Sequence, residues 1–94
     1  MAIESIHNNL ENAVFACVQE KAEHFPHILD NADTLADIAC VALNRLPPRY
    51  IRHDVDFAFY QTDRERSETE RSISEAVEFA FGFVQARNAM RARA

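Results

Sequence analysis

Two adjacent prolines, Pro47 and Pro48, limit the fold of this chain more than any other feature of its sequence. Apolar residues at helical spacing lead up to them and stop at Leu46. A proline lacks the backbone N–H donor and disfavours the α-helical region for the residue before it. A helix must therefore end near Leu46, and the chain leaves it through a stiff segment, residues 44–53, called the elbow below.

A single glycine in 94 residues points the same way. Hairpin turns use glycine for backbone angles that other residues avoid, so an all-β fold is disfavoured and long helices are favoured. The length fits one small domain over residues 1–94. The predicted fold class is mainly α: a small three-helix domain with one short extended strand after the double-proline elbow.

The spacing of apolar residues predicts where the three helices lie. The first covers residues 4–24 and ends before Pro26, with a loop over residues 27–32. The second is capped by Asp30 or Asp33 and ends near Leu46. The third begins at Ser67 or Thr69 and runs to about Met90, with a frayed tail over residues 87–94. Its buried stripe consists of Ile73, Ala76, Val77, Ala80, Phe81 and Val84.

From Tyr50 the apolar period changes to two, which predicts a half-buried strand. A lone strand leaves its backbone groups unpaired, so it pairs with the same strand of a second subunit or docks on the helices. Phe15, Phe79 and Phe83 also lie beside the helical stripes, giving more apolar surface than so small a monomer needs. These features predict a homodimer.

The net charge of −5 disfavours a general nucleic-acid-binding surface. The charge is unevenly distributed, because residues 1–43 hold seven acids and one lysine. The elbow holds three arginines and no acid, and so do the last eight residues. A small anionic ligand can use such a local basic patch within an acidic protein.

The two cysteines, Cys17 and Cys40, lie within apolar helical patterns, which predicts buried free thiols in a reducing compartment. No leader-like start and no apolar run long enough to span a membrane is found in the sequence. We therefore expect a cytoplasmic protein that does not bind membranes.

Motifs for catalysis or metal binding are weak. The sequence has no nucleophile-elbow motif, P-loop or glycine-rich loop, so no enzyme and no cofactor are predicted. His24 and His27 are separated by Pro26 and do not share a helical face, which predicts surface histidines rather than a metal site. His53 falls on the apolar face of the predicted strand and is interpreted as a core or interface histidine.

The elbow carries the strongest candidate chemistry. Arg45, Arg49 and Arg52 offer planar guanidinium groups that bind phosphate oxygens or the O6/N7 edge of guanine. Tyr50 adds an aromatic face for stacking. Asn44 can hydrogen-bond to nearby backbone. The alternative is a helix end followed by three solvated arginines, and the spacing alone does not separate the two.

The stretch DIACVALNRLPPRYI, residues 37–51, resembles the ComFB family, which is named for late competence development. The family pattern is an Asp followed by a helix that ends in L-N-x-L-P-P-x-Y and an apolar residue. The residues that match it are Asp37, Leu43, Asn44, Leu46, Pro47, Pro48, Tyr50 and Ile51. The flanking helices also fit this domain, so the resemblance covers most of the chain.

The resemblance implies a function for the elbow. Relatives that read L-N-R-L-P-P, as this chain does, are implied to be receptors for cyclic dinucleotides, chiefly cyclic di-GMP. They signal to motility, competence or cell-size control through protein partners. Other ComFB-type proteins bind zinc through cysteines before this helix, whereas residues 27–33 here contain none, so zinc is not expected.

These observations predict a non-enzymatic receptor for a cyclic dinucleotide with an unknown downstream protein partner. Arg45, Arg49 and Arg52 are expected to bind phosphate or guanine, and Tyr50 to stack. Asp37 or Asp54 is expected to accept hydrogen bonds from guanine, while Asn44 holds the shape of the elbow. The alternative is a protein-interaction module in competence or motility regulation, which has no nucleotide ligand and docks its partner through its exposed phenylalanines.

Overall fold

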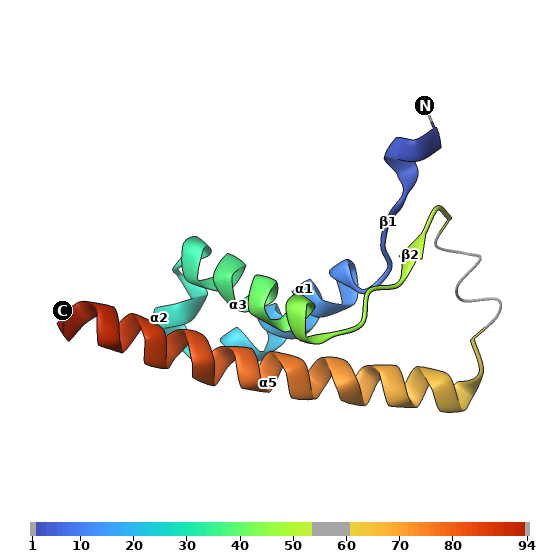
Figure 1. Ribbon diagram of the computed structural model, residues 1–94. Coiled ribbons are helices and arrows are strands. Elements are labelled where there is room, and N and C mark those ends of the chain that lie inside the picture. Colours follow the sequence, from blue (N-terminus) through green and yellow to red (C-terminus); the bar gives the residue numbers. More distant parts are fainter. Residues whose placement is uncertain (1, 54–60, 94) are drawn as a thin grey trace.

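The computed structural model describes residues 2–53 and 61–93 and is mainly helical, as predicted. Helix α5 runs along one side of the molecule, and the two termini lie at opposite ends (Figure 1). In chain order the elements are η1 (Ala2–Ser5), β1 (His7–Asn8), α1 (Glu11–Ala22), α2 (Pro26–Leu29), α3 (Ala32–Arg45), β2 (Tyr50–Ile51) and α5 (Asp63–Arg93).

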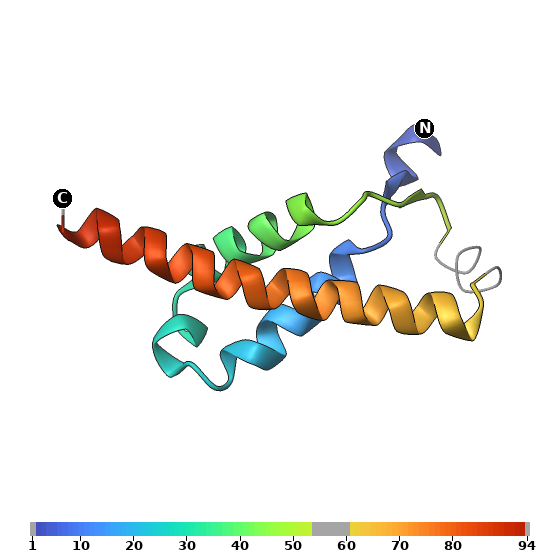
Figure 2. The ribbon, with the colours of Figure 1, turned by 60° about the horizontal axis from the view of Figure 1, so that its bottom comes forward.

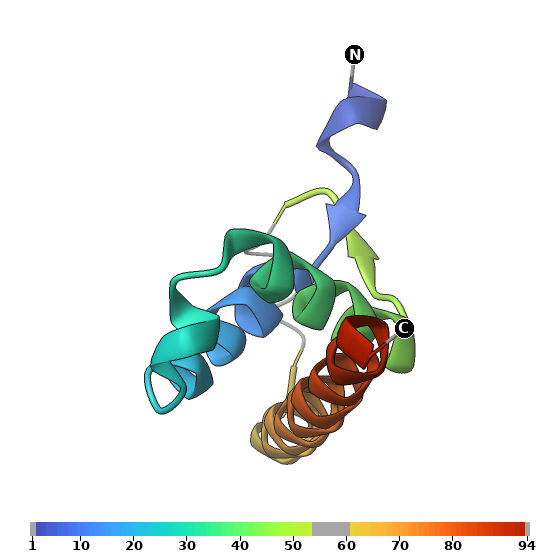
Figure 3. The same cartoon turned by 90° about the vertical axis from the view of Figure 1, so that its left-hand side faces the viewer.

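The core lies where α5 meets α3 and α1, and α5 crosses both helices (Figure 2). Seen nearly along α5, the helices surround one shared interior (Figure 3). The predicted stripe of the last helix is confirmed, because all six of its members are buried. The largest fully buried side chains are Phe81, Ile38, Val14, Val77 and Val84. Apolar burial of this kind is the main stabilising contribution in a domain of this size.

Helix α3 ends where the prolines require. Arg45 is its last residue, and Leu46 is already extended, with φ −103° and ψ 137°. The predicted cap at Asp30 or Asp33 is wrong: Asn31 is the N-cap, and its side-chain oxygen accepts the backbone N–H of Thr34 at 3.1 Å. Asp33 lies within the first turn, where its charge suits the helix dipole.

The first helix begins at Glu11, seven residues later than predicted. His7 and Asn8 form β1 instead, paired antiparallel with β2 in the register His7↔Ile51 and Asn8↔Tyr50. Their backbone groups serve this ladder, and the Asn8 side chain accepts the N–H of Leu10 at 3.1 Å. Both interactions compete with continuation of the helix towards the N-terminus.

The first two residues of the strand predicted after the elbow, Tyr50 and Ile51, thus have their partner within the same chain. The sequence carries no sign of β1, because a strand of two residues is too short to show an alternation of apolar and polar side chains. The pairing of these residues within the chain therefore no longer supports the predicted homodimer. The exposed apolar side chains still support it. The remainder of the predicted strand, residues 54–60, lies outside the described residues.

The loop predicted over residues 27–32 contains the short helix α2, with Pro26 at its start and Ile28 buried. Proline suits this position because the first helical N–H needs no partner there. Among the described residues, no helix is long and apolar enough to cross a membrane.

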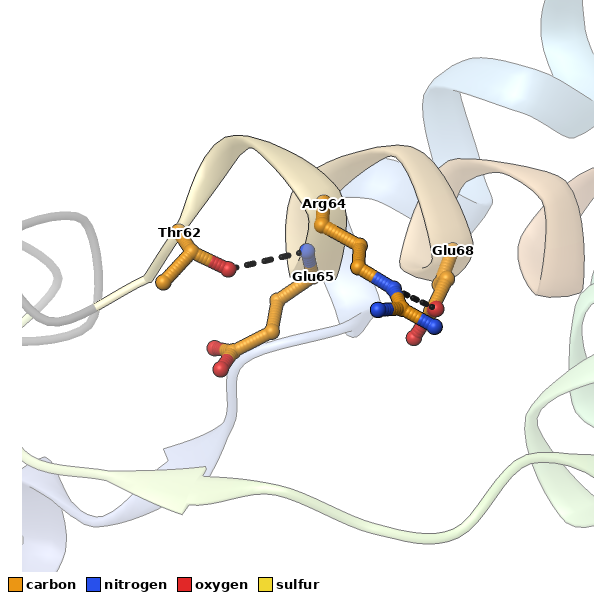
Figure 4. A network of polar contacts seen from close by, with 4 residues as sticks. All are labelled: Thr62, Arg64, Glu65 and Glu68. Carbon is orange, nitrogen blue, oxygen red and sulfur yellow. Dashed lines mark hydrogen bonds and ion pairs between the residues drawn. The ribbon is translucent and has the colours of Figure 1, made fainter.

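Helix α5 starts at Asp63, before the predicted Ser67 or Thr69. The Thr62 hydroxyl accepts the N–H of Glu65 at 3.1 Å, and the guanidinium of Arg64 pairs with Glu68 at 3.1 Å (Figure 4). A side-chain cap and an i,i+4 ion pair both favour a helical start. At the other end the segment expected to fray is helical through Arg93.

Candidate functional site

The elbow is tied to the start of α1 by one asparagine. The side-chain oxygen of Asn8 accepts the N–H of Arg49 at 3.2 Å as well as that of Leu10 at 3.1 Å. The carbonyl of Arg49 in turn accepts the N–H of Asn9 at 2.6 Å. The chain after the prolines is therefore held on both sides of Arg49. Sequence reasoning missed Asn8, although an asparagine side chain that accepts the backbone N–H two residues further on is a known turn signal.

The Arg45 side chain is held by a contact with α5. It occupies the last turn of α3, where a cation is favourable, and its guanidinium carbon lies 3.7 Å from the centroid of the Phe79 ring. The Phe79 ring stacks on that of Phe83, with centroids 5.8 Å apart and planes 22° apart. Sequence reasoning missed this contact because Arg45 and Phe79 are 34 positions apart in the sequence and lie on different helices.

Two hollows flank the elbow where α3 meets α5. One, of about 200 Å³, is lined by Arg49 and by Glu65 and Glu68 of α5. The other, of about 230 Å³, is lined by Arg45 and by Glu75. Leu46, Pro47 and Ser72 line both hollows. Arg45, at the end of α3, and Arg49, after the prolines, therefore line different hollows on the two sides of a short apolar ridge formed by Leu46 and Pro47. Each arginine shares its hollow with carboxylates.

Tyr50 and Arg52 follow Arg49 along the chain. Tyr50 lies in β2 with 68% of its surface exposed, and Arg52 follows the strand and is also exposed. A tyrosine with this exposure presents most of its ring to solvent. Neither Tyr50 nor Arg52 lines either of the two hollows.

The other predicted site residues lie elsewhere. The Asp37 carboxylate accepts a hydrogen bond from Arg87 of α5 at 3.0 Å and lies about two helical turns before Arg45. Asn44 donates from its side-chain amide to the carbonyl of Cys40 at 3.0 Å, a bond along the helix. Asp54 lies outside the described residues. The structure brings Arg45 and Arg49 to the elbow hollows and leaves Asp37 out.

The cysteines and histidines differ from expectation in their exposure. Cys40 is exposed and Cys17 only partly buried, so the prediction of two buried thiols is wrong, although both are free. Burial raises the pKa of the Cys17 thiol, and the nearby Glu20 carboxylate adds to this effect. His53 is exposed after the end of β2, which rules out the core position predicted for it.

Within residues 2–53 and 61–93, no group of three or more metal-ligating side chains occurs. His24 and His27 are both exposed.

Comparison with known proteins agrees with the elbow motif. The family model described as late competence development protein ComFB matches residues 7–88. The matched stretch contains β1, α1, α2, α3, the elbow and most of α5. No curated protein and no solved structure matches the chain.

Proposed function

The chain belongs to the ComFB family, whose name indicates a role related to competence, and we propose that it is a non-enzymatic receptor for a cyclic dinucleotide, cyclic di-GMP in the first instance. One observation carries the proposal: Arg45 and Arg49 line adjoining hollows on the two sides of Leu46 and Pro47. A cyclic dinucleotide has two phosphates and two bases, so two adjoining hollows that each contain an arginine suit its twofold chemistry.

The size of the hollows defines how such a ligand sits. At about 200 and 230 Å³, each is smaller than the roughly 300–1,000 Å³ of a pocket that encloses a small-molecule ligand. The ligand therefore straddles the ridge at Leu46 and Pro47, placing one part in each hollow. Pro47 stiffens this ridge, which lowers the entropy lost on binding.

Arg45 is prepared for this task by Phe79. The guanidinium carbon of Arg45 lies 3.7 Å from the centroid of this ring, so less side-chain freedom is lost when its N–H groups bind phosphate. Arg49 is held through its backbone by Asn8 and Asn9. Tyr50, with its ring mostly exposed, provides a stacking surface for a base.

The carboxylates in the hollows favour a guanine over a bare phosphate. Guanine carries N–H donors on its base-pairing edge, and a carboxylate accepts such donors, whereas it repels a phosphate. Glu65 and Glu75 take this role here, because Glu68 is paired with Arg64. These residues replace Asp37, which is bound to Arg87.

Binding alone transmits nothing, so a protein partner must distinguish the bound from the free state. The second candidate function is an interaction module without a nucleotide ligand. Phe15, Phe79 and Phe83 favour it, because they are 43%, 42% and 47% exposed.

Calorimetric titration with cyclic di-GMP tests the proposal. Wild type and Arg71→Ala are expected to bind alike, because Arg71 is exposed on α5 and lines neither hollow. Arg45→Ala and Arg49→Ala are expected to bind at least about tenfold more weakly, the effect of losing one charge-assisted contact. Absence of heat from wild type at tens of micromolar ligand removes the receptor function and favours the interaction module.

A further inference from the structure

A hollow that the receptor proposal does not use lies between the start of α1 and the first half of α5. Its volume is about 350 Å³, which is larger than either elbow hollow and within the roughly 300–1,000 Å³ of small-molecule pockets. Asn9, Asn12 and Gln61 line it, and we call it the amide hollow. Neither Arg45 nor Arg49 lines it, so it offers a chemistry different from that of the elbow hollows.

The amide hollow has an apolar floor and a polar rim. The floor is formed by Leu10 and Ile73, which are only 4% and 6% exposed. On the rim, the side-chain amide of Gln61 donates to the hydroxyl of Thr69 at 3.5 Å, which holds Gln61 against α5. The amide oxygen of Gln61 has no partner within the described part of the chain, so it can accept from a ligand. An apolar surface with a few orienting polar groups is typical of a small-molecule site.

The rim also carries one charge of each sign. Arg66 and Glu70 both line the hollow and both are exposed. They lie four residues apart on α5, so their Cβ atoms are about 5–6 Å apart on one face of the helix. Within residues 2–53 and 61–93 neither forms an ion pair. Each charge can therefore bind a ligand group of the opposite sign, and the two charges cancel.

This charge pattern selects among classes of ligand. Glu70 repels a phosphate dianion, and a single arginine does not balance such a ligand. Apart from His7, no described lining residue has an aromatic ring that could stack on a nucleobase. A metal ion is disfavoured because the described residues contain no group of three or more ligating side chains. A small zwitterion fits, because its carboxylate suits Arg66 and its ammonium group suits Glu70.

We propose that the amide hollow binds a free α-amino acid with a hydrogen-bonding side chain, for which glutamine is the simplest match. Arg66 binds its carboxylate, and Glu70 binds its ammonium group. The amides of Asn9, Asn12 and Gln61 have both donors and acceptors, and so does the side-chain amide of glutamine. The apolar floor covers the methylene groups between the two ends of the ligand. This site does not depend on the dinucleotide, and its failure leaves the receptor proposal untouched.

Titration of the whole chain with L-glutamine, followed by amide chemical shifts, tests the proposal. Saturable shifts are expected at the side-chain amides of Asn9, Asn12 and Gln61. N-acetyl-L-glutamine lacks the ammonium charge, and the α-amide of L-glutamine lacks the carboxylate. Each analogue is expected to bind at least about tenfold more weakly, the effect of losing one charge-assisted contact. L-leucine is also expected to bind about tenfold more weakly, because it leaves the amides of the hollow unpaired.

Two variants assign the charged contacts when they are combined with these analogues. Arg66→Gln is expected to weaken glutamine binding at least about tenfold but to bind the α-amide as wild type does, because that ligand has no carboxylate. Glu70→Gln is expected to show the same relation with N-acetyl-L-glutamine. Arg71→Gln and Glu78→Gln, at exposed positions of α5 that do not line the hollow, are the matched controls. Circular dichroism confirms that each variant is folded.

Four outcomes overturn the proposal. The first is the absence of saturable shifts at about 10 mM L-glutamine, which is weaker than any specific site of this kind requires. The second is equal binding of glutamine and its two analogues, and the third is wild-type affinity for glutamine in Arg66→Gln or Glu70→Gln. The fourth is loss of cyclic di-GMP binding in these variants, which would make the two sites one. That binding is expected to be unchanged, because neither residue lines an elbow hollow.

Discussion

The carboxylate of Asp37 accepts a hydrogen bond from the guanidinium of Arg87 at 3.0 Å, which joins the outer faces of α3 and α5 across 50 residues of sequence. Arg87 lies in the C-terminal part of α5, which ends at Arg93, and Asp37 lies in the first half of α3. Asp37 is the acidic residue of the family pattern, and this contact gives it a structural role in the fold.

A double-mutant cycle measures that role. Asp37→Asn, Arg87→Gln and the double variant are expected to show a coupling of about 0.5 kcal/mol in the free energy of unfolding by urea, because both side chains are partly exposed and water screens the pair. A coupling indistinguishable from zero contradicts a stabilising ion pair. The same variants in the cyclic di-GMP titration separate the fold from the ligand: Asp37→Asn is expected to bind like wild type.

The only glycine, Gly82, is replaceable. It lies in the middle of α5 without a positive φ, and a Cβ atom built on it meets nothing within 4 Å. Glycine costs about 0.5–1 kcal/mol relative to alanine within a helix, because it loses more backbone entropy on folding. Gly82→Ala is therefore expected to raise the free energy of unfolding by this amount in a urea titration. A destabilised variant contradicts the open surroundings of this residue.

The shape of the elbow is expected to depend on Asn8 more than on any other residue outside it. Asn8→Ala leaves the N–H groups of Leu10 and Arg49 without their acceptor and is expected to cost about 1–2 kcal/mol of folding free energy. Asn8→Asp keeps an acceptor oxygen and serves as the matched control. Hydrogen exchange at the Arg49 amide reads the local effect, and unchanged protection in Asn8→Ala contradicts the assignment.

The two thiols are expected to react at different rates. Cys40 is exposed, whereas Cys17 is partly buried and its pKa is raised by burial and by Glu20. Because the thiolate is the reactive form, a raised pKa leaves less of it at neutral pH and moves the reaction of Cys17 to higher pH. Mass spectrometry after timed iodoacetamide labelling is expected to find Cys40 modified first. Equal rates at neutral pH contradict this order.

The sequence predicted the parts of the fold that local chemistry decides. Pro47 forces the helix end at Leu46, and the apolar spacing of residues 73–84 identifies the buried face of α5. Ile3 and Ile6 lie at helical spacing from Leu10 but are exposed and precede α1, because β1 and the Asn8 side chain use the backbone there. A pairing with residues more than forty positions away leaves no periodic trace in so short a segment.

The site shows the same division. The arginines and Tyr50 of the elbow stood out by charge and spacing, and the structure places Arg45 and Arg49 at two adjoining hollows. The ring that holds Arg45 and the carboxylates that share those hollows come from α5, and only tertiary packing brings them near. Asp37 was chosen as a ligand contact from its place in the motif, whereas the structure shows it paired with Arg87.

The central claim, that a cyclic dinucleotide binds across the elbow, is tested most directly by amide chemical shifts during a titration of the full chain with cyclic di-GMP. The account predicts saturable shifts concentrated at the backbone amides of Arg45, Leu46 and residues 49–52, and at those of Ser72 and Glu75 of α5, which line the hollows. Arg49→Ala is expected to weaken the same response. Saturable shifts confined to residues that line neither elbow hollow, or no shifts at millimolar ligand, contradict the claim.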